Sequence, residues 1–222
     1  MSLDVYAFGS ALMDIQVNVE DHLFDELNVQ KGNMYLTDRT RQEEVLKKLL
    51  GESLTDLGSL GNKANLAAGG SAANAVYGIA QLGGKAALCG KVAHDPFGSL
   101  YIRDMHNGGV QFNEKMVEGM TGTCIVLISD DAQRTMLTCL AVSSEITYDD
   151  LDEQHLKESK YIYIEGYLFD SAVATKTLLK AIHTAKKNNA HWRYSRVHSK
   201  SSQENDIGKA APYRLNIGLL DD

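Results

Sequence analysis

Three features of the amino-acid sequence could bind a ligand that carries hydroxyl groups. Asp14 ends the stretch FGSALMD, and an ionised carboxylate can accept two O–H hydrogen bonds that its charge strengthens. The pair Gly69-Gly70 lets a ligand approach backbone N–H groups, because glycine has no Cβ. Asn74 offers a donor and an acceptor to a hydroxyl. Each polar side chain also has a purely structural interpretation, since Asp14 can cap a turn and Asn74 can be a surface amide of a helix.

The two glycines open a compact unit, GGSAANAVYGIAQLGGKAALCGKVAHDPFG, over residues 69–98. Ser71 is predicted to cap a helix of small apolar residues that ends at Gly83-Gly84. Residues 86–92 predict a buried strand. Asp95-Pro96 predicts the cap and the first residue of another helix. Taken without any relative, this unit is typical of an α/β core.

Strands and helices alternate along most of the remaining sequence. Strands are expected over residues 5–8, 15–19, 33–36, 110–117, 123–129, 134–140 and 161–165. Helices are expected from a capping box of Thr40 and Glu43 to Gly51, and from Ser171 to about Lys187. The alternation predicts a doubly wound, mostly parallel sheet. The early strands and a hairpin in the middle of the chain break it and would form a small separate sheet.

Composition excludes several classes of protein. The chain of 222 residues carries a formal net charge of −7, which argues against a nucleic-acid surface. It contains no apolar run long enough to span a bilayer, and its start lacks the basic leader of a signal peptide. Cys89, Cys124 and Cys139 lack metal-type spacing and are expected to be buried free thiols in a reducing compartment. No metal site is expected, and a cytoplasmic location fits best.

The unit over residues 69–98 resembles the first signature of the ribokinase-like (PfkB) family of sugar and nucleoside kinases. TGTCIVLISDDAQRTML and YIEGYLFD are similar to segments of its adenosine-kinase-like branch; in the second, Glu165 ends a central strand where α/β proteins usually bind ligands. The resemblance implies a three-layer, doubly wound, mostly parallel α/β sheet with a small β-sheet lid. The lid strands would lie roughly over residues 15–36 and 110–140.

The resemblance also implies roles for particular residues. The positions that match the family's contacts to sugar or ribose hydroxyls are Asp14, Gly69, Gly70 and Asn74. Thr123 would lie near the substrate, and Arg134 would approach the reacting phosphate or serve only as a charged strand-edge residue. Ser10 stands where adenosine-kinase relatives often have Asn, so the motifs do not separate adenosine from other nucleosides or from free sugars.

Members of the family transfer the γ-phosphate of ATP, with Mg²⁺, to a primary hydroxyl. Their second signature, a Gly-Ala-Gly-Asp run, supplies the anion hole and the general-base Asp. After Gly166 this sequence has only Gly208 and Gly218, and neither belongs to such a run, so no catalytic residue is assigned. The resemblance covers residues 1–190. Residues 191–222 are expected to be a divergent, poorly ordered tail that lacks the buried strand required next by the alternation and is strand-like only over residues 215–220, and the C-terminal ATP-binding half is missing.

Several interpretations of such a chain stay open. It would be a portion of a kinase, inactive by itself, produced either by a truncated coding sequence or as a natural short form. It could instead be a non-catalytic nucleoside- or sugar-binding module, or an inert product whose exposed sheet edge aggregates. A dinucleotide-dependent oxidoreductase is disfavoured because no G-x-G-x-x-G joins the first strand to a first helix. Its partner would be a small molecule, and the protein would be a monomer or a homodimer.

Overall fold

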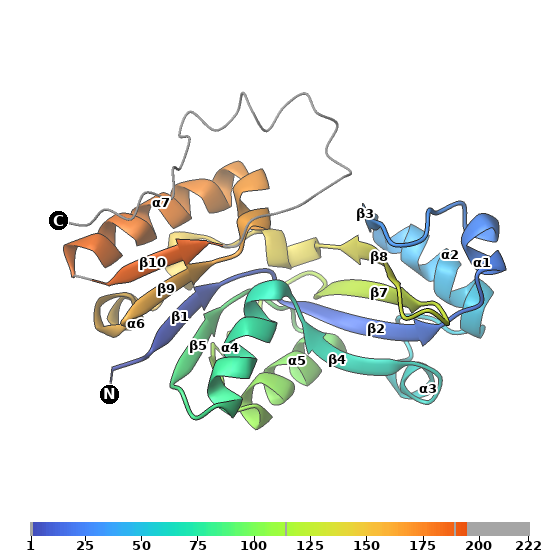
Figure 1. Ribbon diagram of the computed structural model, residues 1–222, viewed down its shortest axis with the longest axis horizontal. Coiled ribbons are helices and arrows are strands. Elements are labelled where there is room, and N and C mark those ends of the chain that lie inside the picture. Colours follow the sequence, from blue (N-terminus) through green and yellow to red (C-terminus); the bar gives the residue numbers. More distant parts are fainter. Residues whose placement is uncertain (1, 114, 189, 195–222) are drawn as a thin grey trace.

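Two five-stranded sheets organise the chain, whose computed structural model describes residues 2–113, 115–188 and 190–194 (Figure 1). The main sheet has the order β10-β9-β1-β5-β6 and is parallel throughout. Its strands are β1 (Val5–Phe8), β5 (Ala86–Cys89), β6 (Gln111–Phe112), β9 (Tyr161–Ile164) and β10 (His191–Tyr194). The predicted parallel α/β sheet is confirmed.

The second sheet, which we call the lid sheet, has the order β3-β8-β7-β2-β4. Its strands are β2 (Leu12–Asn18), β3 (Met34–Leu36), β4 (Asn65–Gly69), β7 (Gly122–Ile128) and β8 (Arg134–Cys139). It is a mixed sheet, because β2 pairs parallel with β7 but antiparallel with β4, and β7 and β8 form the predicted antiparallel hairpin. β2 follows β1 almost directly, so the two sheets adjoin where β1 ends (Figure 1).

Helices cover both faces of the main sheet. Successive residues of a strand point to opposite faces, so Ala7 packs with Val76 and Tyr101, whereas Phe8 packs in a separate core cluster with Leu178. The helices on the first face are α4 (Ser71–Gln81) and α5 (Pro96–Asn107), and those on the second are α6 (Glu153–Glu158) and α7 (Ala172–Lys187). Three short 3-10 helices lie in the links between strands and helices. η1 (Ala141–Ser144) and η2 (Tyr148–Asp150) lie between β8 and α6, and η3 (Gly166–Asp170) lies between β9 and α7.

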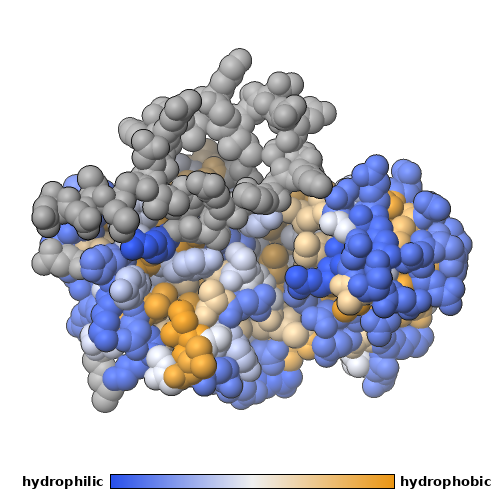
Figure 2. All heavy atoms as spheres, in the orientation of Figure 1, coloured by the Kyte–Doolittle hydropathy of each residue, from blue (hydrophilic) through white to orange (hydrophobic). Residues whose placement is uncertain are grey.

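One face of the lid sheet packs on its own helices, α1 (His22–Glu26), α2 (Arg39–Leu50) and α3 (Leu57–Gly61). Ile15 and Leu127 of the sheet share the first core cluster with Leu46 of α2. Figure 2 shows that hydrophilic side chains cover this end of the molecule, whereas a small hydrophobic patch lies beside α4. No helix in the described ranges is long and apolar enough to cross a membrane.

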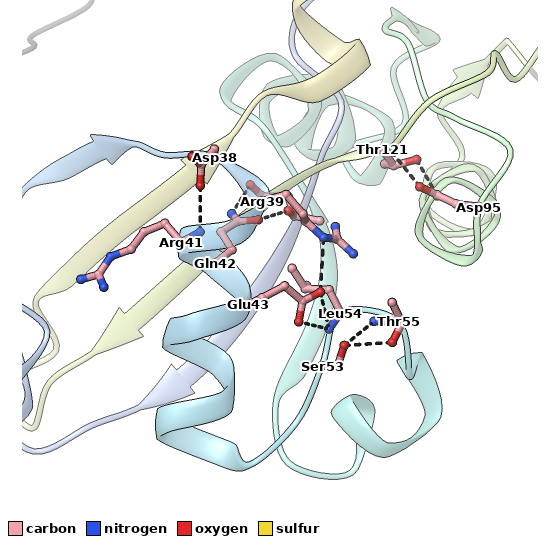
Figure 3. Close-up of polar contacts among 11 residues, drawn as sticks. Asp38, Arg39, Arg41, Gln42, Glu43, Ser53, Leu54, Thr55, Asp95 and Thr121 are labelled. Atoms are coloured by element: carbon pink, nitrogen blue, oxygen red, sulfur yellow. Dashed lines mark hydrogen bonds and ion pairs between the residues drawn. The ribbon is translucent and has the colours of Figure 1, made fainter.

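Two predicted helix caps are wrong. Asp38, not the Thr40–Glu43 pair, caps α2 by accepting the Arg41 N–H at 2.8 Å (Figure 3), and the Glu43 carboxylate instead accepts the N–H of Leu54. Local sequence allowed both caps, but Glu43 has a tertiary partner in the loop after α2.

Gly70, not Ser71, is the cap residue of α4, and it makes no side-chain cap. In contrast, the Asp95 cap of α5 is confirmed, with its Oδ1 accepting the Gly98 N–H at 2.7 Å. Gly51 ends α2 as expected, in the left-handed conformation at φ +70°.

Three strands differ from the sequence-based expectation. β6 lies in the part expected to join the lid but pairs parallel with β5 of the main sheet. β4 was not foreseen, because its strand NLAAG is short and directly precedes the Gly-Gly turn. β10 was not expected either, yet residues 191–194 pair parallel with β9.

The amino-acid pattern of β10 explains why it escaped prediction. Trp192 is half-buried and packs against the core under α7, whereas His191 and Arg193 are exposed. Among the described strands β10 lies at the end of the sheet, so only one of its faces needs to be apolar. The rest of the segment expected to be a poorly ordered tail, from residue 195, lies outside the described residues.

Candidate functional site

The predicted Asp14 and Gly-Gly features meet where the main sheet and the lid sheet join. β2 and β4 pair antiparallel, which places Asp14 opposite Ala67 and Leu12 opposite Gly69. A Cβ atom on Gly69 would lie 2.4 Å from Asp14 Oδ1, much closer than any real contact. The carboxylate of Asp14 therefore lies directly against the backbone of Gly69, and only glycine fits there.

Gly70 has a separate requirement. Its φ is +101°, a conformation that L side chains rarely adopt, and a Cβ there would lie 2.3 Å from the carbonyl oxygen of Ser10. The Gly-Gly turn is thus pressed against the β1–β2 link on one side and against Asp14 on the other. This geometry leaves a glycine backbone beside a carboxylate at the carboxyl end of β1, where ligands bind in doubly wound sheets.

The electrostatic environment of Asp14 makes it a proton-sensitive acceptor. Burial raises the pKa of Asp14 to about 6, and the positive charge of Arg134 opposes this rise. Asp14 lies beside Cys124 of β7, and Arg134 pairs with Ile128 on the same strand. Because Cys124 and Ile128 are an even number of residues apart, Asp14 and Arg134 share one face of the lid sheet. The structure thus places these two predicted site residues on a common surface.

Thr123 lies on the opposite face of that sheet. Its hydroxyl is buried and donates to Gln42 Oε1 at 2.6 Å, and the Gln42 amide donates to the carbonyl oxygens of Thr123 and Leu137. The Thr123 hydroxyl therefore binds α2 to the lid sheet and is not brought to Asp14. Because β7 is buried at nearly every position, its sequence did not indicate which face of the strand carries Thr123.

Asn74 lies in the first turn of α4, and its side chain is exposed. Its backbone N–H donates to the Gly70 carbonyl oxygen at 2.9 Å, as the first helical turn requires. The helix thus begins at the Gly-Gly turn, and the exposed amide of Asn74 lies within one helical turn of it.

Glu165 connects three elements at this junction and was recognised in sequence only as the end of a strand. It is 3% exposed, and its Oε2 accepts the Ser10 N–H at 2.7 Å. A Cβ on Gly9 would lie 2.5 Å from the same oxygen. Burial raises the pKa of Glu165, while hydrogen bonds from the Ser10 backbone and the Ser71 side chain lower it. The signal in sequence was a carboxylate directly after the apolar strand YIYI.

The groups at the junction suit one kind of ligand. Two cavities elsewhere in the described structure, of about 380 Å³ beside α1 and 620 Å³ beside α6, are lined by residues other than Asp14 and the glycine pair. In the described part of the chain, no group of three His, Cys, Asp or Glu side chains could hold a metal ion. A carboxylate acceptor, an exposed amide and a glycine backbone together suit a neutral ligand with several hydroxyls.

Comparison with known proteins identifies the family. The family model of pfkB carbohydrate kinases matches residues 47–213, which is more than half of the chain. The chain belongs to the pfkB family of carbohydrate kinases. The predicted family and its ribokinase-like fold are therefore confirmed. The family match extends past residue 190, where the resemblance drawn from the motifs ended.

Individual pfkB relatives differ in the substrates that their names state. The chain is 30% identical over 126 residues to 5-dehydro-2-deoxygluconokinase from Clostridium beijerinckii, covering 54% of this chain and 37% of that protein. It is 31% identical over 108 residues to the ATP-dependent ribose-1-phosphate kinase of Halopiger xanaduensis, covering 48% of this chain and 36% of that protein. The matched part is therefore little more than a third of these relatives.

Solved kinase structures agree with the fold. The adenosine kinase from Sinorhizobium meliloti superimposes with a TM-score of 0.77 at 31% identity, covering 87% of this chain and 56% of that chain. The "probable sugar kinase protein" from Rhizobium etli gives a TM-score of 0.78 at 28% identity, with the same coverage of 87% and 56%. The chain thus spans little more than half of either structure.

Proposed function

We propose that this chain forms the substrate-binding half-site of a pfkB-type kinase, which moves the γ-phosphate of ATP to a primary hydroxyl of a nucleoside or sugar. The observation that carries the proposal is the close packing of the Asp14 carboxylate against the backbone of Gly69, at the carboxyl end of β1. A structural cap would not need this arrangement, because Asp14 lies within a strand and its carboxylate accepts no cap hydrogen bond among those found in the described residues.

The roles of the residues follow from their chemistry. Asp14 accepts hydrogen bonds from two neighbouring hydroxyls, and the backbone of Gly69-Gly70 and the amide of Asn74 contact the same ligand. Arg134, on the same face as Asp14, is the cation for a phosphate group. Thr123 is left out of this proposal, because its hydroxyl is already bound to Gln42.

The nucleotide side of the reaction is not built by the residues present. Family membership implies the use of ATP, with Mg²⁺, but the 222 residues contain no Gly-Ala-Gly-Asp run. The described residues also offer no three-ligand metal site. We therefore assign no residue to ATP or Mg²⁺. This chain by itself is expected to bind its ligand without transferring phosphate, which also makes a non-catalytic binding module the second candidate function.

The ligand class stays at nucleoside or sugar. Relatives of comparable identity are named for a sugar acid, a sugar phosphate and adenosine, and Ser10 stands at the end of β1 beside the glycine turn. Adenosine and ribose are therefore the paired probes, because they share the ribose hydroxyls and differ in the base.

Calorimetric titration of the folded chain with adenosine and with ribose tests the proposal. We expect heat of binding with at least one ligand and a loss of about tenfold or more in affinity for Asp14→Asn, since a charged acceptor is worth more than 1.4 kcal/mol. Asp130→Asn, in the exposed hairpin turn, is the matched control and should bind like the unaltered chain. Absence of heat with both ligands, from a sample whose circular dichroism shows α/β structure, would contradict the proposal.

A further inference from the structure

Two side chains of α5 form hydrogen bonds with the end of strand β4, at Ala68 and at the first glycine of the Gly-Gly turn. The Tyr101 hydroxyl donates to the carbonyl oxygen of Gly69 at 3.1 Å, and Asp104 Oδ2 accepts the N–H of Ala68 at 2.9 Å. The Tyr101 side chain is fully buried, and its ring lies 5.3 Å from that of Phe112. Since α5 packs on the main sheet and β4 belongs to the lid sheet, both hydrogen bonds cross from one sheet layer to the other.

These hydrogen bonds bind the backbone of β4 from outside the lid sheet. β4 is the last strand of that sheet and pairs with β2 only, so one side of its backbone has no ladder partner among the described strands. A polar backbone group that is buried without a partner costs free energy comparable to a lost hydrogen bond. Asp104 accepts the N–H of Ala68, and Tyr101 donates to the carbonyl oxygen of Gly69, which can accept two hydrogen bonds, so together they favour one position of the strand end.

The position of this strand end sets the geometry of Asp14. The Asp14 carboxylate already lies in the space that a Cβ of Gly69 would occupy, so even a small inward shift of β4 would displace it. An outward shift would separate the carboxylate from the glycine backbone. The hydrogen bonds from α5 to β4 therefore keep the Asp14 carboxylate and the Gly69 backbone at a fixed spacing. These are the two groups proposed to contact ligand hydroxyls.

The N-cap residue of α5, Asp95, makes a second, independent attachment to the lid sheet. The Asp95 carboxylate accepts the backbone N–H and the hydroxyl of Thr121, both at 2.7 Å (Figure 3). Thr121 directly precedes β7, and β2 lies between β7 and β4 in the lid sheet. One helix therefore anchors both β4 and β7 to the main sheet.

We propose that Tyr101 and Asp104 are positioning residues that hold β4 and the Gly69-Gly70 turn against Asp14, and so set the affinity of the half-site. The effect on affinity rests on the proposed function. The effect on β4 rests on the two hydrogen bonds alone. Neither side chain is placed in contact with the ligand.

Amide hydrogen exchange tests the hold on β4 directly. In Tyr101→Phe and in Asp104→Leu we expect exchange over residues 65–70 to accelerate by about tenfold or more, because each variant removes one hydrogen bond at the strand end. Exchange in β5 should stay unchanged. Asp104→Asn keeps an acceptor oxygen and should restore protection. Equal acceleration in β5, or no acceleration in β4, would overturn the inference.

Titration with adenosine and ribose tests the effect on affinity. Tyr101→Phe and Asp104→Leu should weaken binding by about tenfold, whereas Asp104→Asn should bind nearly as well as the unaltered chain. Tyr161→Phe and Asn107→Leu, at exposed positions, are the matched controls. If the unaltered chain binds and the two variants bind equally well, the inference fails and the proposed function stands. If the unaltered chain binds neither ligand, the proposed function fails and the exchange result alone decides on the positioning role.

Discussion

At the scale of single residues, the proposed half-site depends on a carboxylate held in an environment that disfavours its charge. Asp14 lies against the glycine backbone, and burial raises its pKa to about 6. Only the ionised form offers both oxygens as charge-assisted acceptors, because the protonated acid carries a donor O–H on one of them, so the fold holds in place a charge that burial disfavours. Such a conflict between stability and local chemistry is typical of functional sites.

The raised pKa of Asp14 predicts a pH-dependent affinity. Binding of adenosine or ribose should be constant well above pH 6, fall as the pH passes through 6 and level off near the affinity of Asp14→Asn, because the protonated acid loses its charge-assisted acceptors. Calorimetry at a series of pH values measures this. Asp14→Asn should bind more weakly than the unaltered chain above pH 6 and show no such dependence, and an unchanged profile in that variant would assign the titration to another group.

The same pKa shift carries the opposite sign for stability. The folded chain binds a proton on Asp14 more readily than the unfolded chain, so this group destabilises the fold as the pH rises from about 4 through 6. Asp14→Asn should therefore raise the free energy of unfolding at pH 7 by roughly 1–3 kcal/mol while weakening binding. Urea unfolding of both proteins at pH 4 and pH 7 checks the sign, since the difference between them should shrink at the lower pH.

At the scale of secondary-structure elements, the lid sheet is held by polar contacts buried between strands and helices. Gln42 of α2 is fully buried and binds β7 and β8 through three hydrogen bonds to Thr123 and Leu137. Tyr101 and Asp104 of α5 hold β4 in a similar way. In each case helix side chains hydrogen-bond to the strands of the lid sheet, which specifies one arrangement of the element.

Loss of the Gln42 amide should destabilise the lid sheet. Gln42→Leu keeps a similar volume but leaves the Thr123 hydroxyl without this partner, so we expect the free energy of unfolding to fall by roughly 2–4 kcal/mol. Urea unfolding followed by far-UV circular dichroism measures the change. Gln154→Leu on the exposed surface of α6 is the control and should stay within about 0.5 kcal/mol of the unaltered chain. A similarly small effect of Gln42→Leu would show that the buried amide is dispensable.

At the scale of the whole molecule, the two sheets share one apolar core although they form separate layers. Met13 and Leu127 of the lid sheet belong to the same buried cluster as Ala7 and Leu88 of the main sheet. The second cluster, under α6 and α7, adjoins it across the main sheet through neighbouring residues of β1. Continuity of this kind favours cooperative unfolding.

We expect a single unfolding transition for the described fold. The only tryptophan, Trp192, lies on β10 at one end of the main sheet, far along the sheet from the lid, and reports on the second cluster. Its fluorescence and the far-UV circular dichroism of the whole chain should give coincident urea transitions. Separate midpoints for the two signals would show that the layers unfold independently.

Sequence by itself determined the elements whose signals are local. The Asp95-Pro96 helix start, the Gly51 helix end and the β7–β8 hairpin follow from caps, glycines and runs of apolar residues. So do the strands predicted over 86–92 and 161–165, which the structure ends at 89 and 164. Motif order also indicated that Asp14 and Gly69-Gly70 belong to one site, and it indicated the family. These features depend on residues that are neighbours in the chain or on an order of motifs that can be read along it.

Only the tertiary structure decided which groups face one another. It placed the Thr123 hydroxyl on Gln42, gave Glu43 a partner at Leu54 and supplied Asp104 to the N–H of Ala68. It also made residues 191–194 a strand, which pairs with β9 at the end of the described sheet and packs Trp192 against the core. Such contacts join residues distant in the chain, and which face of a strand is buried depends on packing partners that a local pattern does not contain.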